Sequence, residues 1–255
     1  MVAKSSSKNK INFWIVTPCW KRPEITEFIF REFLWAKNQT KSYLNLNIVA
    51  VGEGPNLKIA KKYRFHTVNR DNKFLGRKFN DGYEYAFRHG ANLAIPIGSD
   101  SWVHPDIFIH TSKVWRDNGS IFYSTKHAMI SETGLTLGLI TSPPRNNEYN
   151  KCALLFYPRS LMAACNFRPC NEKQKKSCDR STIENILRRR KDAKFVKNAD
   201  VNDLQYLAFK NKEVQIWKYK DYKAQFRKQH ANPWQIIQKH YPGELTKYAR
   251  SYYGV

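Results

Sequence analysis

Asp100 closes the tripeptide Gly98-Ser99-Asp100, which directly follows the apolar run ANLAIPI. Glycine and serine allow the backbone to bend and a ligand to approach closely. A carboxylate at the end of a buried strand offers the hard oxygen ligand that Mg²⁺ or Mn²⁺ prefers, and such an ion acts as a Lewis acid on a leaving group. The sequence therefore predicts a divalent metal at Asp100. The alternative is a residue that only ends the strand.

Three more polar blocks follow apolar runs in chain order. Thr17-Pro18-Cys19-Trp20-Lys21-Arg22-Pro23 comes after residues 11–17, and Glu53 comes after residues 46–52. The third block has the spacing N-x-x-x-G-x-x-x-N-x-G; its residues are Asn72, Gly76, Asn80 and Gly82, with Arg77 and Lys78 between them. Each block alone also fits an ordinary helix entry, turn or cap. Their common placement after successive apolar runs favours one shared site.

The elements that must position these blocks alternate in type. Short apolar runs predict strands over 11–17, 46–52, 65–69 and 91–98, whereas apolar residues three or four apart predict helices over 23–37 and 77–89. Strands separated by helices indicate an α/β fold with a mostly parallel sheet that has helices on both faces. Ligands of such sheets bind beyond the carboxyl ends of the strands, where all four polar blocks fall.

The second half of the chain is harder to interpret. We expect a helix near 107–116, a strand over 120–125 and extended segments around 136–140 and 152–158. We also expect a loop over 166–178, a basic helix over 181–191 capped by Asp179 or Ser181, a strand over 214–219, and a last helix from Pro233 that ends at Pro242-Gly243. The segment 203–209 is ambiguous.

Together, the blocks resemble those of GT-A glycosyltransferases, especially the small single-domain enzymes of the broad family-two type found in bacteria and phages. The resemblance covers roughly residues 11–110 and implies a GT-A-type, Rossmann-like fold. It also implies inverting transfer of a sugar from a nucleotide sugar, habitually a UDP-sugar. The donor-binding residues that it implies are Thr17, Pro18, Trp20, Arg22, Glu53, Asn72, Gly76, Arg77, Lys78, Asn80 and Ser99.

Gly98-Ser99-Asp100 matches the DXD-like motif of that family, with Gly98 in place of the first acidic residue. This departure leaves metal binding to Asp100 alone. The resemblance also implies a carboxylate beyond this motif, often just before a helix, that takes the proton of the acceptor hydroxyl. Asp179 fits that location best, and Glu132 and Glu172 are the next candidates; a helix cap is the alternative role for Asp179.

We expect a single domain over 11–255 after a disordered basic tail at 1–10. Within it, residues 11–110 form the predicted nucleotide-sugar half, residues 111–230 the acceptor half, and residues 231–255 a helical tail. The chain carries 44 Lys and Arg against 21 Asp and Glu, a formal charge of +23. Such a charge attracts polyanions, through phosphate contacts that weaken with salt.

The predicted acceptor is a hydroxymethylated or hydroxylated pyrimidine in phage DNA, which would have to leave the base stack to meet a buried donor. A first alternative is transfer to an envelope polysaccharide, a lipid carrier or a protein. A second is a non-catalytic nucleic-acid-binding module on a transferase fold.

Apolar runs and cysteines in the sequence indicate the compartment of the protein and whether a membrane anchor is present. No apolar run approaches the ~20 residues of a membrane helix, and the first residues lack the apolar stretch of a signal peptide. The five cysteines are an odd number in a chain this long, which favours reduced thiols. We therefore expect a cytoplasmic protein, in the host cytoplasm if a phage encodes it.

Overall fold

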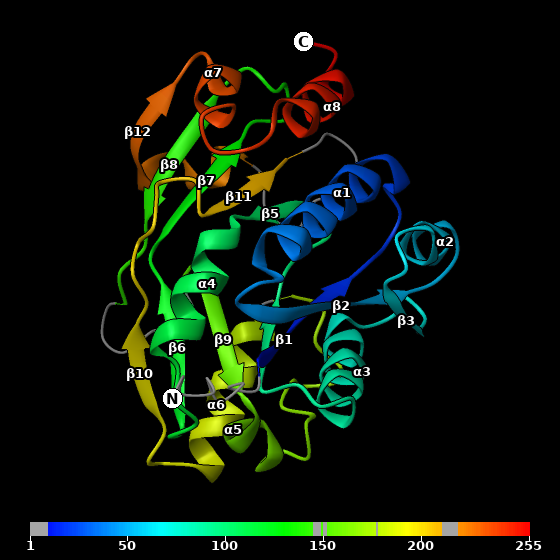
Figure 1. Cartoon of the computed structure of the whole chain (residues 1–255), viewed down its shortest axis with the longest axis vertical. Helices are drawn as coiled ribbons and strands as arrows, with labels where there is room; N and C mark the ends of the chain where they lie inside the picture. The colour runs from blue at the N-terminus through cyan, green and yellow to red at the C-terminus, as the bar shows by residue number, and fades with distance from the viewer. Residues whose placement is uncertain (1–9, 145–148, 150–151, 177, 211–218) are drawn as a thin grey trace, which may run out of the picture.

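The computed structural model describes residues 10–144, 149, 152–176, 178–210 and 219–255. Its central feature is a seven-stranded sheet with the strand order β10-β6-β9-β4-β1-β2-β3 (Figure 1). Only β9 runs against its neighbours β4 and β6. The strands are β1 Ile11–Pro18, β2 Leu44–Gly52, β3 His66–Asn69, β4 Leu93–Pro96, β6 Ser120–Ser124, β9 Leu154–Pro158 and β10 Lys194–Lys197. The predicted mostly parallel sheet is confirmed.

Helices cover both faces of this sheet, as predicted. In β1, Phe13 and Ile15 point into one apolar cluster with helices α1 (Pro23–Thr40) and α4 (Pro105–Val114). Trp14 and Val16 point into a second cluster with α3 (Leu75–Arg88), α5 (Arg159–Ala163) and α6 (Cys178–Arg189). Alternate side chains of a strand face opposite sides, so β1 contributes to both cores. This two-sided burial explains why the first strands are nearly all apolar.

A second sheet continues from the first. Its order is β12-β8-β7-β11-β5, and its strands are β5 Ser101–Val103, β7 Lys126–Ile130, β8 Leu137–Thr141, β11 Tyr206–Phe209 and β12 Phe226–His230. It lies at the end of the molecule that also carries α7 (Pro233–Ile237) and α8 (Gly243–Tyr253) (Figure 1). The two sheets exchange strands along the chain: β5 joins the second sheet, whereas the later strands β6, β9 and β10 join the first.

Several local predictions need correction. Helix α2, Pro55–Lys62, was not expected, because its eight residues are too short and polar to show a clear apolar stripe. Asp179 and Ser181 lie within α6 rather than before it. The expected last helix is two helices: Ile237 ends α7, and Gly243 begins α8 instead of ending a helix. The ambiguous segment 203–209 contains β11.

Two predictions concern residues that lie outside the described part of the chain. They are the tail over 1–10, apart from Lys10, and the strand over 214–219, apart from Tyr219. Tyr219 begins the 3-10 helix η2, Tyr219–Gln225.

Candidate functional site

The loops that follow β1 and β2 are joined at the carboxyl edge of the central sheet. The Cys19 amide donates to the carbonyl of Val51 at 2.8 Å, and the Arg70 amide after β3 donates to the carbonyl of Gly52 at 2.8 Å. A Cβ at Gly52 would lie 2.5 Å from the Cys19 carbonyl oxygen. Glycine is therefore required where these loops meet, since a side chain would force them apart.

Lys78 joins the same loops from helix α3. Its Nζ donates to the Cys19 carbonyl oxygen at 2.7 Å and to Asn72 Oδ1, and only 2% of the residue is exposed. Burial lowers the pKa of Lys78, while the charges of Glu53 and Asp71 oppose that effect. Two predicted blocks thus come together at one ammonium group, and Glu53 is within its electrostatic reach. Lys78 therefore has a structural role, because its ammonium group donates hydrogen bonds to the loops after β1 and β3.

The β1–α1 loop has a strained backbone. Lys21 and Arg22 both adopt left-handed conformations, with φ of 50° and 52°. Such conformations cost a non-glycine residue roughly 1–2 kcal/mol each, and they concentrate at functional sites. Asn56 Nδ2 donates to the Lys21 carbonyl at 3.0 Å and supports the turn. The turn leaves the Trp20 side chain 44% exposed beside the end of β1.

Asp100 lies where the chain passes from β4 in the first sheet to β5 in the second. Its Oδ2 accepts from Arg22 Nη1 at 3.3 Å, and its Oδ1 accepts from Ser101 Oγ at 3.2 Å. Burial raises the pKa of Asp100, but the charges of Lys210 and Arg22 outweigh it and hold the pKa below its ordinary value. Asp100 is therefore an ionised carboxylate facing two cations.

This donor set does not fit a divalent cation. Mg²⁺ and Mn²⁺ are held by several oxygen ligands, usually from more than one carboxylate or with substrate phosphates. The described residues contain no group of three or more His, Cys, Asp or Glu side chains that could hold an ion. One oxygen of Asp100 already accepts from a guanidinium, and the charge of Lys210 opposes a second cation. We therefore derive no step through a metal.

Tyr206 connects Asp100 to Asp179. Its hydroxyl lies 2.9 Å from Ser101 Oγ. Burial raises the pKa of Tyr206, and the negative charges of both Asp100 and Asp179 raise it further. Both carboxylates are therefore within electrostatic reach of one phenol. We call Trp20, Arg22, Glu53, Asn72, Asp100, Asp179, Tyr206 and Lys210 the strand-end site.

The carboxyl of Asp179 has a raised pKa. Burial raises its pKa from 3.8 to about 6, only partly offset by its own backbone N–H. A carboxylate with a pKa near the working pH accepts a proton more readily than an ordinary aspartate does. Asp179 lies in the first turn of α6, where the positive end of the helix dipole favours its ionised form.

Glu132 and Glu172 are engaged elsewhere. Glu132 Oε1 accepts from the Tyr219 backbone amide at 2.9 Å, in the turn between β7 and β8. Glu172 is 48% exposed and accepts from Arg168 Nη2 at 2.8 Å, and this bond lowers its pKa. Glu132 and Glu172 are thus both held by hydrogen bonds to donors outside the strand-end site, so Asp179 is the strongest base candidate of the three.

The third block has a largely structural environment. Asn80 is fully buried; its Nδ2 donates to the Cys170 carbonyl at 3.0 Å, and its Oδ1 accepts from the Cys170 amide at 2.8 Å. A Cβ at Gly76 would lie 2.0 Å from the Asn171 carbonyl oxygen. Both residues therefore fasten the 168–174 loop to helix α3.

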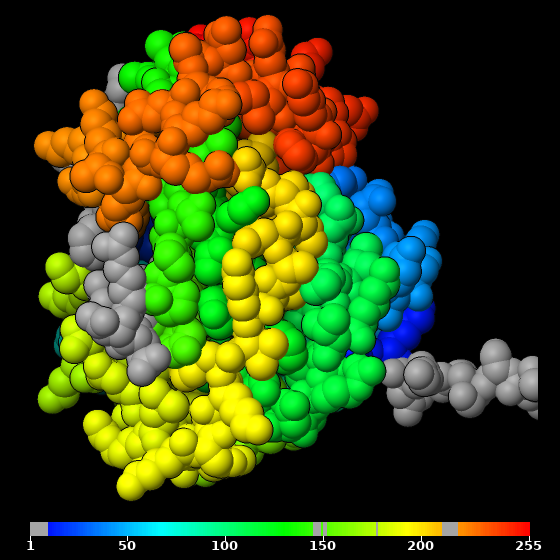
Figure 2. Space-filling view, turned by 90° about the vertical axis from the view of Figure 1, so that its left-hand side faces the viewer, coloured from blue at the N-terminus to red at the C-terminus, as the bar shows by residue number. Residues whose placement is uncertain are grey.

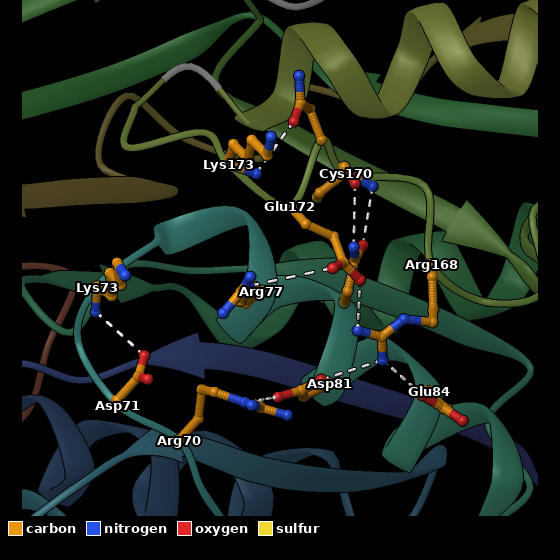
Figure 3. Close-up of polar contacts among 12 residues, drawn as sticks. Arg70, Asp71, Lys73, Arg77, Asp81, Glu84, Arg168, Cys170, Glu172 and Lys173 are labelled. Carbon is orange, nitrogen blue, oxygen red and sulfur yellow. Dashed lines mark hydrogen bonds and ion pairs between the residues drawn. The ribbon is translucent and has the colours of Figure 1, made fainter.

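An ion network surrounds that contact. Arg168 bridges Asp81, Glu84 and Glu172, Arg70 pairs with Asp81 from the opposite side, and Arg77 Nε lies 4.0 Å from Glu172 (Figure 3). Asp81 is 9% exposed, so this carboxylate is the buried centre of the network. Arg77, which the sequence assigned to the donor, is thus drawn toward the 168–174 loop.

The other predicted donor residues differ in accessibility. Glu53 is exposed, and Ser99 and Thr17 are buried, with 2% and 0% exposure. Pro18 ends β1 and is partly buried. The exposed Trp20 and Glu53 follow the adjacent parallel strands β1 and β2.

Sequence reasoning missed three residues of the second sheet. They are Tyr206 and Lys210, on and just after β11, and His127 on β7. His127 is 9% exposed, and burial followed by the charge of Lys210 lowers its pKa to about 4. The only available signal was the polar residues inside the apolar segment QYLAFK, which an isolated four-residue strand makes too weak to interpret.

A separate cleft lies between α1 and α8. Its volume is about 590 Å³, and its lining includes Glu24, Arg31, Glu244, Lys247 and Tyr248. None of the strand-end residues lines it. The convergence of polar loops, rather than this cleft, defines the candidate site.

No protein-family model and no curated protein matches this chain. Among solved structures it is similar to glucosyl-3-phosphoglycerate synthase from M. tuberculosis, with a TM-score of 0.48 and 11% identity over 91% of this chain and 81% of that one. It is also similar to 4-diphosphocytidyl-2C-methyl-D-erythritol synthase from Anaerococcus prevotii DSM 20548, with a TM-score of 0.47 and 14% identity over 75% of this chain and 90% of that one. These identities are too low to carry an activity from either enzyme to this chain.

Within the described residues, no helix is long and apolar enough to span a membrane.

Proposed function

We propose that this chain is a glycosyltransferase that moves a sugar from a nucleotide sugar to a hydroxyl acceptor. The observation that carries the proposal is the joining of the loops after β1, β2, β3 and β4 at one edge of the central sheet. Arg22 links the loop after β1 to Asp100 after β4, and Lys78 links the loops after β1 and β3. This is the edge where open parallel sheets bind their ligands.

The donor-side roles follow from exposure and charge. The indole of Trp20 offers a flat, exposed surface for a nucleobase, and Glu53 offers acceptor oxygens for a base or ribose hydroxyl. Arg22 and Lys210 bring positive charge toward Asp100 at the sheet junction, where the diphosphate would lie. UDP is the nucleotide that the sequence resemblance favours.

Asp179 is the proposed general base. Its carboxylate takes the proton of the acceptor hydroxyl while that oxygen attacks the anomeric carbon. The bond between this carbon and the diphosphate oxygen breaks, and the electron pair leaves with the nucleoside diphosphate. Attack opposite to the leaving group would invert the anomeric configuration.

The proposed acceptor is a hydroxylated pyrimidine in DNA. Its support is the charge of +23 and a basic segment beside the site. Tyr222, in η2, has a pKa raised by burial and by the charges of Asp221 and Asp100. Lys220, Lys223 and Lys228 around it are exposed. Figure 2 shows this segment, coloured orange, on the surface of the second-sheet end of the molecule. A DNA acceptor would place the reaction in the cytoplasm.

The test is release of nucleoside diphosphate from a panel of UDP-sugars, with and without DNA that contains 5-hydroxymethyl pyrimidines. Each reaction is run once in EDTA and once with Mn²⁺, and the DNA is then digested to nucleosides for mass analysis. We expect a hexose-sized mass gain on one nucleoside. Stimulation by anionic vesicles or polysaccharide instead would move the acceptor to the cell envelope. DNA binding without any turnover or nucleotide-sugar binding would contradict a glycosyltransferase.

A further inference from the structure

Two segments far apart in the sequence meet at the start of α3. The Gly76 amide donates to the Gln174 carbonyl oxygen at 3.0 Å, and a Cβ at Gly76 would lie 2.0 Å from the Asn171 carbonyl oxygen. This backbone contact holds residues 70–77, which follow β3, against residues 168–176, which precede α6. We call these two segments together the loop junction.

The loop junction is continuous in the chain with both sides of the proposed reaction. Asn72 of the strand-end site belongs to its first segment. Asp179, the proposed general base, follows its second segment in the first turn of α6. A macromolecule bound to the loop junction would therefore lie beside the proposed base.

The loop junction carries a surplus of positive charge. It contains two acidic residues, Asp71 and Glu172, and seven basic ones, Arg70, Lys73, Arg77, Arg168, Lys173, Lys175 and Lys176. Its arginines are engaged with carboxylates: Arg70 and Arg168 both pair with the buried Asp81. Arg168 also pairs with Glu84 and Glu172. The lysines therefore carry the surplus.

Three of these lysines, Lys73, Lys173 and Lys175, are exposed and form no ion pair within the part of the chain that the structure describes. Lys73 Nζ lies 5.7 Å from the ring centre of Phe74, and the Arg77 guanidinium lies 5.2 Å from the same ring. Such cation–π contacts keep both cations at the loop junction (Figure 3). No ion pair has to break before the three lysines can bind an anion.

We propose that the loop junction binds the phosphate backbone of duplex DNA and holds the acceptor nucleotide beside Asp179. This inference rests on the proposed function and names the surface that its DNA acceptor would use. Lysines on a surface supply phosphate contacts that position a duplex without reading its bases. They also release the counterions that are condensed on DNA, which favours binding.

The composition of the loop junction favours DNA over a membrane surface. Stable attachment to anionic lipid combines charge with apolar side chains that enter the bilayer. Among the described residues, none of the exposed large apolar side chains belongs to the loop junction. Charge without an apolar group suits a phosphate backbone in water.

The experiment measures binding of the full chain to a fluorescent DNA duplex by anisotropy, from about 0.05 to 0.3 M salt. The triple variant Lys73→Gln, Lys173→Gln, Lys175→Gln should lower the slope of log affinity against log salt by about 3. At about 0.15 M salt it should weaken binding roughly 100-fold, because each released counterion contributes about fivefold there. Arginine at the same three positions should retain the affinity, since phosphate contacts need only the charge.

Lys239→Gln is the matched control. Lys239 is exposed and follows α7, at the end of the molecule opposite α6 (Figure 1). Its loss should leave the slope and the affinity unchanged. Melting curves confirm that each variant is folded.

A footprint on the unaltered protein tests the same surface without any variant. The chain is acetylated with and without DNA, and mass analysis then measures the modification of each lysine. DNA should protect Lys73, Lys173 and Lys175 at least about threefold more than Lys239, because bound phosphate covers the first three.

Each outcome separates the binding surface from the proposed function. An unchanged salt slope in the triple variant, or no protection of its lysines, would overturn the loop junction and leave the DNA acceptor to the lysines of η2. Binding to vesicles of phosphatidylserine and phosphatidylcholine instead of DNA would overturn the partner and move the acceptor to the cell envelope. If neither binds, the inference fails, and release of nucleoside diphosphate from UDP-sugars by the same protein decides the glycosyltransferase proposal separately.

Discussion

The two sides of the strand-end site are built differently. On the donor side, each residue follows its own strand of a parallel sheet: Trp20 follows β1, Glu53 follows β2 and Asp100 follows β4. On the acceptor side, Tyr206 comes from β11, a four-residue strand that pairs antiparallel with β5 and parallel with β7. The donor side is therefore determined by local sequence, whereas the acceptor side depends on contacts between distant segments.

This difference places rigidity and chemistry in separate regions. The donor loops are tied together by backbone hydrogen bonds, a glycine contact and the buried Lys78. The acceptor side holds His127, Asp179 and Tyr206, whose pKa values are shifted first of all by burial. Substitutions on the donor side should therefore affect stability first, and those on the acceptor side should affect turnover first.

The largest expected effect is on turnover, from Asp179→Asn. Loss of a general base should lower kcat by about 10³-fold, within the usual range for such groups, with little change in donor affinity. In the wild type, activity should fall as pH decreases through about 6, because the carboxylate becomes protonated. Steady-state kinetics from pH 5 to pH 8 would check both. A kcat within threefold of wild type would remove Asp179 from the mechanism.

Asp179→Asn should lower activity but raise the free energy of unfolding at high pH. A raised carboxyl pKa means that the folded state binds the proton more tightly, so this stabilisation is complete below pH ~4 and is lost as pH rises through about 6. Asp179→Asn should therefore be more stable than wild type at pH 8, by about 2 kcal/mol, with the difference shrinking toward pH 4. Urea denaturation at both pH values measures this.

On the donor side, Gly52→Ala should destabilise the fold by about 2–3 kcal/mol, since its Cβ would lie 2.5 Å from the Cys19 carbonyl oxygen. Gly243→Ala is the matched control, because no atom lies within 4 Å of a Cβ there and the residue begins α8. Chemical denaturation should show a loss only for Gly52→Ala. Equal stability of the two variants would mean that the loops after β1 and β2 are not packed as described.

Asn80→Ala should cost about 2 kcal/mol, because the buried amide and carbonyl of Cys170 both lose their partner. The 168–174 loop should also become easier to cleave by a protease, while kcat changes less than in Asp179→Asn. Limited proteolysis followed by mass analysis locates the cut. A kcat loss as large as that of Asp179→Asn would instead give Asn80 a direct role in the site.

The smallest effect should come from Arg168→Met, about 1 kcal/mol, since Arg168 is 32% exposed and solvent screens its ion pairs. The loss should shrink further at high salt. Thermal melting at two salt concentrations checks this. A loss that salt does not change would show that the buried Asp81 carboxylate, rather than the exposed pairs, dominates the network.

The sequence predicted the first half of the fold well, because β1 to β4 are apolar runs whose helices show a clear periodicity. Helix α2 was missed because PNLKIAKK has little apolar content. The second sheet was largely missed because its strands have three to five residues, too few for a pattern to be recognised. The two ends of the Arg22–Asp100 pair were both predicted, but Lys210 was not, since only the folded chain brings it to Asp100 from 110 positions away.

The most direct test is a crystal structure of the chain with UDP bound. The account predicts the uracil against Trp20 and Glu53, and the diphosphate between Arg22 and Lys210. UDP bound in the cleft between α1 and α8, or at any site without contact to the loops after β1 and β4, would contradict it.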